Sequence, residues 1–99
     1  MRIQRGECRR RPESPKTMQE LYSTALDMCQ WGERNNAATA MFSEHHSSPD
    51  GYLPSPIIMA AAAAARTETL TFNVGALLLL MYDPVKLAED IAVLDHLSG

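Results

Sequence analysis

The chain has 99 residues, of which 45% are apolar and 21% charged, with a formal net charge of −3. This composition is typical of a globular chain that holds one domain at most. The charge is unevenly distributed: residues 1–16 contain six basic and two acidic side chains, a net charge of +4, so the remaining 83 residues carry −7. A basic lead-in on an acidic body disfavours a general nucleic-acid-binding protein.

Neither a membrane span nor a secretory signal is indicated. The longest apolar runs, residues 57–65 and 74–81, are well short of the roughly 18 residues that indicate a transmembrane helix. The basic start is followed by prolines and charges rather than by an apolar core, which excludes a secretory signal. Cys8 and Cys29 lack a C-x-x-C partner, and Cys29 lies in an apolar-periodic segment where it is expected to be buried. We therefore expect a cytoplasmic protein.

The first predicted helix begins at Thr17. Residues 1–16 are rich in charge and broken by prolines, so we expect them to be a poorly ordered lead-in. Thr17 and Glu20 then have the T-x-x-E spacing in which both side chains cap a helix. Apolar residues recur at intervals of three and four up to Arg34 and predict one buried face. The Asn35-Asn36 pair is expected to end the helix, because asparagine tolerates the left-handed conformation.

Two strands and two further helices are predicted after it. Residues 37–43 favour a short strand buried on both faces, and residues 70–79 favour a second strand whose aliphatic run lies in the core. A Ser-Pro-Asp-Gly turn at 48–51 is followed by a helix over 55–66, and Asp83-Pro84 begins a helix that ends at Gly99. This alternation predicts an α/β fold with a parallel sheet. Because so small a sheet leaves both edges unpaired, we expect it to be part of a larger barrel or doubly wound sheet.

Candidate chemistry lies at the end of the first predicted strand. Glu44, His45 and His46 fall where parallel α/β folds carry their active sites. The histidines can exchange protons near neutral pH, and Glu44 could orient one of them or pair with a cation. The alternative is a solvated polar loop. Adjacent side chains on a strand diverge and His96 is distant, so no metal site is expected.

Other signatures of catalysis are missing or weak. No G-x-S-x-G elbow and no glycine-rich phosphate-binding motif is present. The step from Gly75 to Ala76 is the one place where a flat ligand could approach the backbone closely, since neither residue has a bulky side chain.

Six short pieces of the chain together carry a family resemblance. They are Ser-Glu-His-His at 43–46, Asp-Gly-Tyr-Leu-Pro-Ser-Pro at 50–56, Ala-Ala-Arg-Thr at 64–67, Asn-Val-Gly-Ala at 73–76, Asp-Pro-Val-Lys-Leu-Ala-Glu-Asp at 83–90 and Leu-Asp-His-Leu-Ser-Gly at 94–99. In this order the chain resembles the bacterial luciferase-like flavin-dependent monooxygenases. The predicted first helix also fits, so the resemblance covers about 80 residues.

The resemblance implies a partial (β/α)₈ TIM barrel, with residues 17–99 as its amino-terminal third. It implies oxidation of an organic small molecule by a reduced flavin, either FMN or a deazaflavin coenzyme, and oxygen. By position, His45 matches the catalytic histidine of the family, with Glu44 and His46 as its neighbours in the pocket. Gly75 and Ala76 match the bulged strand that backs the flavin ring, often through a cis peptide. Family dimers pack through the helices that correspond to 56–66 and 84–97.

The chain also departs from the family. Its basic start stands where the family has an apolar first strand, and Leu80 replaces a usual proline. The phosphate-binding loops of the later strands are not among these 99 residues, so we expect the isolated chain to bind flavin weakly or not at all, and micromolar binding would contradict this. The alternative function is a non-catalytic barrel subunit that packs on a full-length partner. A hydrolase is a third hypothesis and would require activity without flavin.

Overall fold

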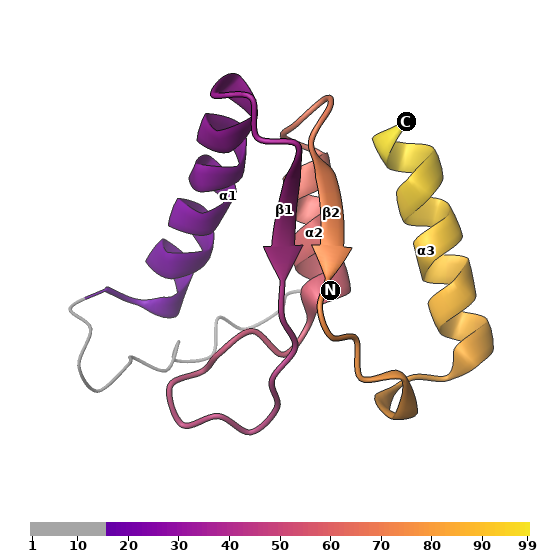
Figure 1. The fold of residues 1–99 in the computed structure, drawn as a ribbon. Coiled ribbons are helices and arrows are strands. Elements are labelled where there is room, and N and C mark those ends of the chain that lie inside the picture. Colours follow the sequence, from indigo (N-terminus) through magenta and orange to yellow (C-terminus); the bar gives the residue numbers. More distant parts are fainter. Residues whose placement is uncertain (1–15) are drawn as a thin grey trace, which may run out of the picture.

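The computed structural model describes residues 16–99 and confirms the expected alternation of helices and strands (Figure 1). The elements are, in order, α1 (Met18–Arg34), β1 (Thr39–Phe42), α2 (Pro56–Ala64), β2 (Thr71–Val74), the short 3₁₀-helix η1 (Leu79–Met81) and α3 (Pro84–Ser98). The expected basic lead-in lies, apart from Lys16, outside the described residues. In Figure 1 the two strands lie between α1 and α3, and α2 crosses one face of the sheet.

Local capping residues explain the boundaries of the helices. The Thr17 backbone amide donates to the Glu20 carboxylate at 2.6 Å, and the Glu20 amide donates to the Thr17 hydroxyl at 3.2 Å, which is the predicted capping box. Asn36 follows α1 with a φ of +64°, as expected of a helix-ending asparagine. Asp83 accepts a hydrogen bond from the Lys86 amide at 3.0 Å and caps α3. Ser55, in contrast, makes no side-chain capping bond to α2.

The sheet is parallel, as predicted. Thr39 pairs with Thr71 and Phe42 with Val74. In the described part of the chain the sheet has only these two strands, so each has one unpaired edge. Parallel pairing brings the two carboxyl ends to the same edge of the sheet, which is where the candidate residues follow β1.

A small core joins α1, α2 and the sheet. Cys29, Ala63 and Leu70 are buried together, and Leu26, Ala40, Phe42 and Phe72 pack against them. Ala63 is fully buried, so its small side chain allows α2 to lie close to the sheet. Cys29 is buried, which confirms the expectation for this cysteine, and this burial raises the pKa of its thiol.

The two strands are shorter and less buried than predicted. Both alternate between exposed and half-buried residues, so the expectation of strands buried on both faces is wrong. The reason is that, among residues 16–99, α2 is the helix that packs on both strands. The aliphatic run at 77–80 is not a core strand: Leu78, Leu79 and Leu80 are exposed, and the last two belong to η1. The strand pairing ends at Phe42 and Val74, and the Gly75 amide makes the last bond to β1, at the Phe42 carbonyl.

Two helix faces also differ from expectation. Met18 and Cys29 of α1 are buried, but Met28 on the same predicted stripe is 65% exposed. In the alanine run of α2, Ala60 and Ala63 are buried within the chain, so only part of that run faces outward. No helix of residues 16–99 is long and apolar enough to cross a membrane.

Candidate active site

Two segments meet at the carboxyl edge of the sheet. Residues 43–46 leave the end of β1, and residues 75–82 leave the end of β2. Glu44 lies between them with its side chain fully buried, although it is charged. A buried carboxylate requires hydrogen-bond donors around it, and these donors define the site.

Three donors surround the Glu44 carboxylate. Its Oε2 atom accepts a hydrogen bond from the Leu78 backbone amide at 2.8 Å. Its Oε1 atom accepts one from the Tyr82 hydroxyl at 3.0 Å and lies 2.7 Å from Nε2 of His46. Glu44 therefore joins β1 to a segment 34 to 38 residues further along the chain. The structure thus brings Glu44 into contact with one of the two histidines, His46, and its role in orienting that ring stays a prediction.

The hydrogen bonds also decide the charge of Glu44. Burial raises its pKa, but the bonds from Leu78, His46 and Tyr82 outweigh this effect, so the pKa lies below its ordinary value. Burial raises the pKa of Tyr82, and the bond to the Glu44 carboxylate and its negative charge add to this increase. The network at neutral pH is thus an ionised carboxylate held by a neutral phenol.

His45 points to different partners. Its backbone amide donates to the Leu53 carbonyl at 3.0 Å. Its ring meets Tyr52 edge to face, with 4.6 Å between the ring centroids and an interplanar angle of 85°. The two adjacent imidazoles thus contact different residues, although both lie beyond the end of β1 rather than in a strand. His45 is exposed.

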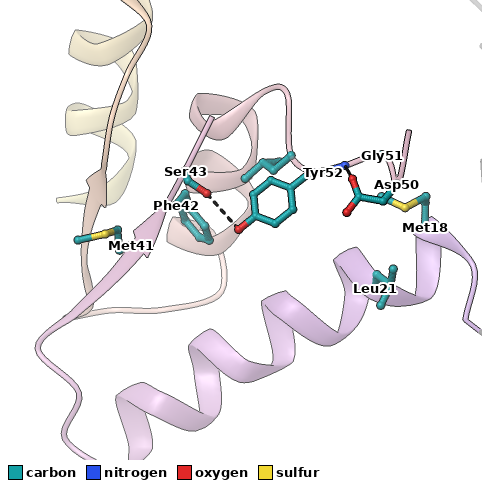
Figure 2. A pocket seen from close by; sticks show the side chains of 9 residues that line it. Met18, Leu21, Met41, Phe42, Ser43, Asp50, Gly51 and Tyr52 are labelled. Atoms are coloured by element: carbon teal, nitrogen blue, oxygen red, sulfur yellow. Dashed lines mark hydrogen bonds between the residues drawn. The ribbon is translucent and has the colours of Figure 1, made fainter. Parts of the chain in front are cut away.

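A hollow of about 230 Å³ opens beside Tyr52 (Figure 2). It is bounded by the amino end of α1, the carboxyl end of β1 and the loop that carries Gly51, with the following lining residues: Met18, Leu21, Met41, Phe42, Ser43, Asp50, Gly51, Tyr52 and Leu53. The Ser43 hydroxyl donates to the Tyr52 hydroxyl at 3.2 Å, and the Asp50 carboxylate accepts from the Tyr52 amide at 3.1 Å. The hollow is mainly apolar with a few hydroxyl and carboxylate groups, and Tyr52 connects it to His45.

Gly75 and Ala76 directly follow β2 at the carboxyl edge of the sheet. The peptide bond between them is cis, and the Gly75 amide donates to the Phe42 carbonyl at 2.9 Å. Both residues are exposed, so their backbone is accessible to a flat ligand. Among the residues that the structure describes, no group of three or more histidine, cysteine or acidic side chains is placed to hold a metal ion.

Sequence reasoning missed three groups of this site. Tyr82 was not singled out, because a tyrosine before a helix cap carries no recognisable signal. The Leu78 amide could not be found either, since its role depends on where the chain runs after β2 ends at Val74. Tyr52 lies in a piece that carried the family resemblance, but nothing in the sequence indicated its contact with His45.

Comparison with known proteins identifies the family. The family model described as luciferase-like monooxygenase matches residues 8–99. This chain belongs to that family. The match agrees with the resemblance carried by the six sequence pieces and with the alternation of helices and parallel strands in residues 16–99.

Relatives of the family show which part of a longer protein is matched. The chain is 26% identical over 89 residues to the oxygenase component of a flavin-dependent trigonelline monooxygenase from Acinetobacter baylyi, which covers 90% of this chain and 25% of that protein. It is 31% identical over 74 residues to 4-hydroxyprotoasukamycin monooxygenase from Streptomyces nodosus subsp. asukaensis, covering 75% of this chain and 20% of the relative. The chain thus spans about a quarter of the length of the relatives it matches, and it corresponds to their amino-terminal portion.

A solved structure supports the same assignment. The oxygenating constituent of 3,6-diketocamphane monooxygenase from Pseudomonas putida, in complex with FMN, matches with a TM-score of 0.78 and 25% sequence identity. The match covers 89% of this chain and 24% of the other. The fold of residues 16–99 is therefore that of a partial TIM barrel of the luciferase-like type, as expected.

Proposed function

We propose that this chain supplies part of the active site of a luciferase-like flavin-dependent monooxygenase, which oxidises an organic small molecule with reduced flavin and oxygen. The observation that carries the proposal is that His45, the Glu44–His46 pair and the exposed backbone of Gly75 and Ala76 meet at one edge of the sheet. In α/β barrels this carboxyl edge carries the active site.

The flavin would lie against Gly75 and Ala76. Neither residue has a side chain larger than a methyl group, and both are exposed, so a planar ring can approach the backbone. A bound flavin supplies the electrons that activate oxygen. Residues 16–99 offer no phosphate-binding glycine motif, so we expect this chain alone to bind FMN or a deazaflavin weakly or not at all.

His45 is the proposed catalytic residue. Its ring is exposed and held edge-on by Tyr52, so it is available to donate or accept a proton at a bound molecule. The mainly apolar hollow beside Tyr52 would take a carbon-rich part of the organic substrate.

A second candidate function follows from the exposed apolar side chains of α2 and α3. Ile58, Val93 and Leu97 are 57% to 79% exposed, which is unusual for large apolar groups on neighbouring helices. We propose that these helices form a homo- or heterodimer contact. A chain that served only as a non-catalytic subunit on a longer relative would use the same surface, and sedimentation would then show a stable complex without any flavin response.

Titration with FMN, followed by backbone NMR shifts, tests the main proposal. Any response should be weak, with Kd in the millimolar range or higher, and its shift changes should be confined to residues 43–46 and 75–78. Adenosine monophosphate, which has the sugar phosphate but no flavin ring, should not produce them. Ala76→Leu should remove the response, and Ala61→Leu, which changes another exposed alanine, on α2, should not. Equal changes with both nucleotides, or changes confined to α2 and α3, would contradict the proposal.

A further inference from the structure

The Glu44 carboxylate binds a backbone amide and two side chains at the same time. One oxygen fixes the Leu78 amide, and the other is shared between Tyr82 and His46. Because the side chain is fully buried, these partners replace the water that the carboxylate has lost. The arrangement therefore constrains each partner, including the protonation of the imidazole.

The geometry decides where the proton of His46 lies. An ionised carboxylate has no hydrogen to donate, and the contact between Nε2 and Oε1 is 2.7 Å, so the hydrogen between them belongs to Nε2. Tyr82 donates its own hydrogen to the same oxygen and cannot supply one to the imidazole. Neutral His46 then has its unprotonated lone pair on Nδ1. The His46 side chain is 33% exposed, and within residues 16–99 Nδ1 has no hydrogen-bond partner.

We propose that Glu44 is a positioning residue that keeps the proton of neutral His46 on Nε2 and leaves Nδ1 as the nitrogen that exchanges protons with a bound molecule. Nδ1 takes a proton from an acidic group of that molecule, and the imidazolium that forms is stabilised by the adjacent carboxylate. The proton then returns from Nδ1 to the product or to water. The edge thus holds two proton-exchanging imidazoles, His45 beside Tyr52 and His46 beside Glu44.

The same carboxylate sets the position of the imidazole relative to the flavin-side segment. Leu78 lies two residues after Ala76, and its amide donates a hydrogen bond to Glu44. His46 is therefore held at a fixed place relative to that segment. The identity of the bound molecule rests on the proposed function, whereas the placement of the proton does not.

Nitrogen-15 NMR of the histidine rings in the wild-type chain tests the inference without flavin or substrate. His96 on α3 has no side-chain partner among the described residues and serves as an internal reference. We expect the Nε2 proton of neutral His46 to exchange with water at least about tenfold more slowly than that of His96, and Nδ1 to show the shift of an unprotonated nitrogen. An Nδ1-protonated His46, or two rings with equal exchange, would overturn the proposal while leaving the proposed flavin site untouched.

Two matched variants distinguish a positioning role of Glu44 from a general effect on the stability of the fold. In Glu44→Gln the neutral amide has one accepting oxygen, so it cannot serve His46 and Leu78 together. Hydrogen exchange with water is measured at His46 Nε2 and at the Leu78 backbone amide. The protection against exchange should fall about tenfold at one of these two groups or at both. Glu33→Gln changes another carboxylate that ties distant backbone, and it should leave His46 unaffected. The proposal fails if Glu44→Gln leaves both protections unchanged, or if Glu33→Gln alters His46 to the same extent.

Discussion

The two ends of the sheet are each held by one glutamate, and the glutamates are used differently. At the amino end, Glu33 near the end of α1 reaches the segment just before β2. A single oxygen accepts the backbone amides of Glu68, Thr69 and Leu70 at 2.6 to 3.0 Å, together with the Thr69 hydroxyl at 3.0 Å. None of these donors titrates in the physiological range. The amino end therefore holds a purely structural contact.

At the carboxyl end, Glu44 also joins segments that are distant in sequence, but two of its three partners are ionisable side chains. Leu78 offers a backbone amide, Tyr82 a phenol whose raised pKa keeps it neutral, and His46 an imidazole. The same residue type thus holds only backbone and hydroxyl donors at one end and also contacts an imidazole at the other. This division agrees with the general separation of stability and activity between the two faces of α/β barrels.

Among the variants that test the difference between the two ends of the sheet, removal of Glu44 should lower the free energy of unfolding the most. Glu44→Ala leaves the Leu78 amide, the Tyr82 hydroxyl and His46 without their buried acceptor, so the free energy of unfolding should fall by about 2–3 kcal/mol. Urea unfolding followed by circular dichroism measures this change. Glu89→Ala, which removes an exposed carboxylate from α3, is the control and should shift the midpoint little. A similar loss in both variants would mean that burial of Glu44 adds no stability.

Acid should weaken both ends of the sheet. The pKa of Glu33 is lowered, chiefly by the Thr69 amide, and the pKa of Glu44 is lowered by its three donors against the effect of burial. A folded-state pKa below the unfolded value means that the stabilisation is complete above about pH 4.5 and is lost as the pH falls through the folded pKa. The free energy of unfolding should therefore decrease between pH 6 and pH 3.

Glutamine variants assign that decrease to each end. Glu33→Gln and Glu44→Gln each remove one titrating group, so each should flatten the pH dependence of urea unfolding. If one variant keeps the full slope of the wild type, the carboxylate at that end is not held in its ionised form by the fold.

The sequence predicted the order of elements, and the place of the candidate cluster after β1, because both depend on local patterns. The Thr17 and Glu20 capping box, the Asp83 cap and the left-handed Asn36 are decided by neighbours within a few residues. The candidate cluster at 44–46 was located from the rule that parallel strands carry functional residues at their carboxyl ends. The resemblance to the family added the cis peptide at Gly75 and Ala76, which the structure contains.

What the sequence missed depends on contacts between distant segments. The aliphatic run at 77–80 has the composition of a core strand, but the strand pairing ends at Val74, and the Leu78 amide donates to the Glu44 carboxylate instead. Tyr82 is a partner of Glu44 although 38 residues separate them, and no local pattern reports that pairing. Burial was overestimated because it depends on how many neighbours cover a strand, and the described residues supply few.

The smallest predicted effect concerns the two tyrosines at the carboxyl edge. Tyr82→Phe removes one hydrogen bond to the ionised Glu44 and should lower the free energy of unfolding by about 1 kcal/mol. Tyr52→Phe removes a hydroxyl that, among residues 16–99, pairs with Ser43, and the residue is 44% exposed, so the effect should stay below about 0.5 kcal/mol. Urea unfolding of both variants at neutral pH measures the difference. Equal effects would show that Tyr82 is no more tied to the edge than Tyr52 is, and the stabilising part of the Glu44 network would then reduce to Leu78 and His46.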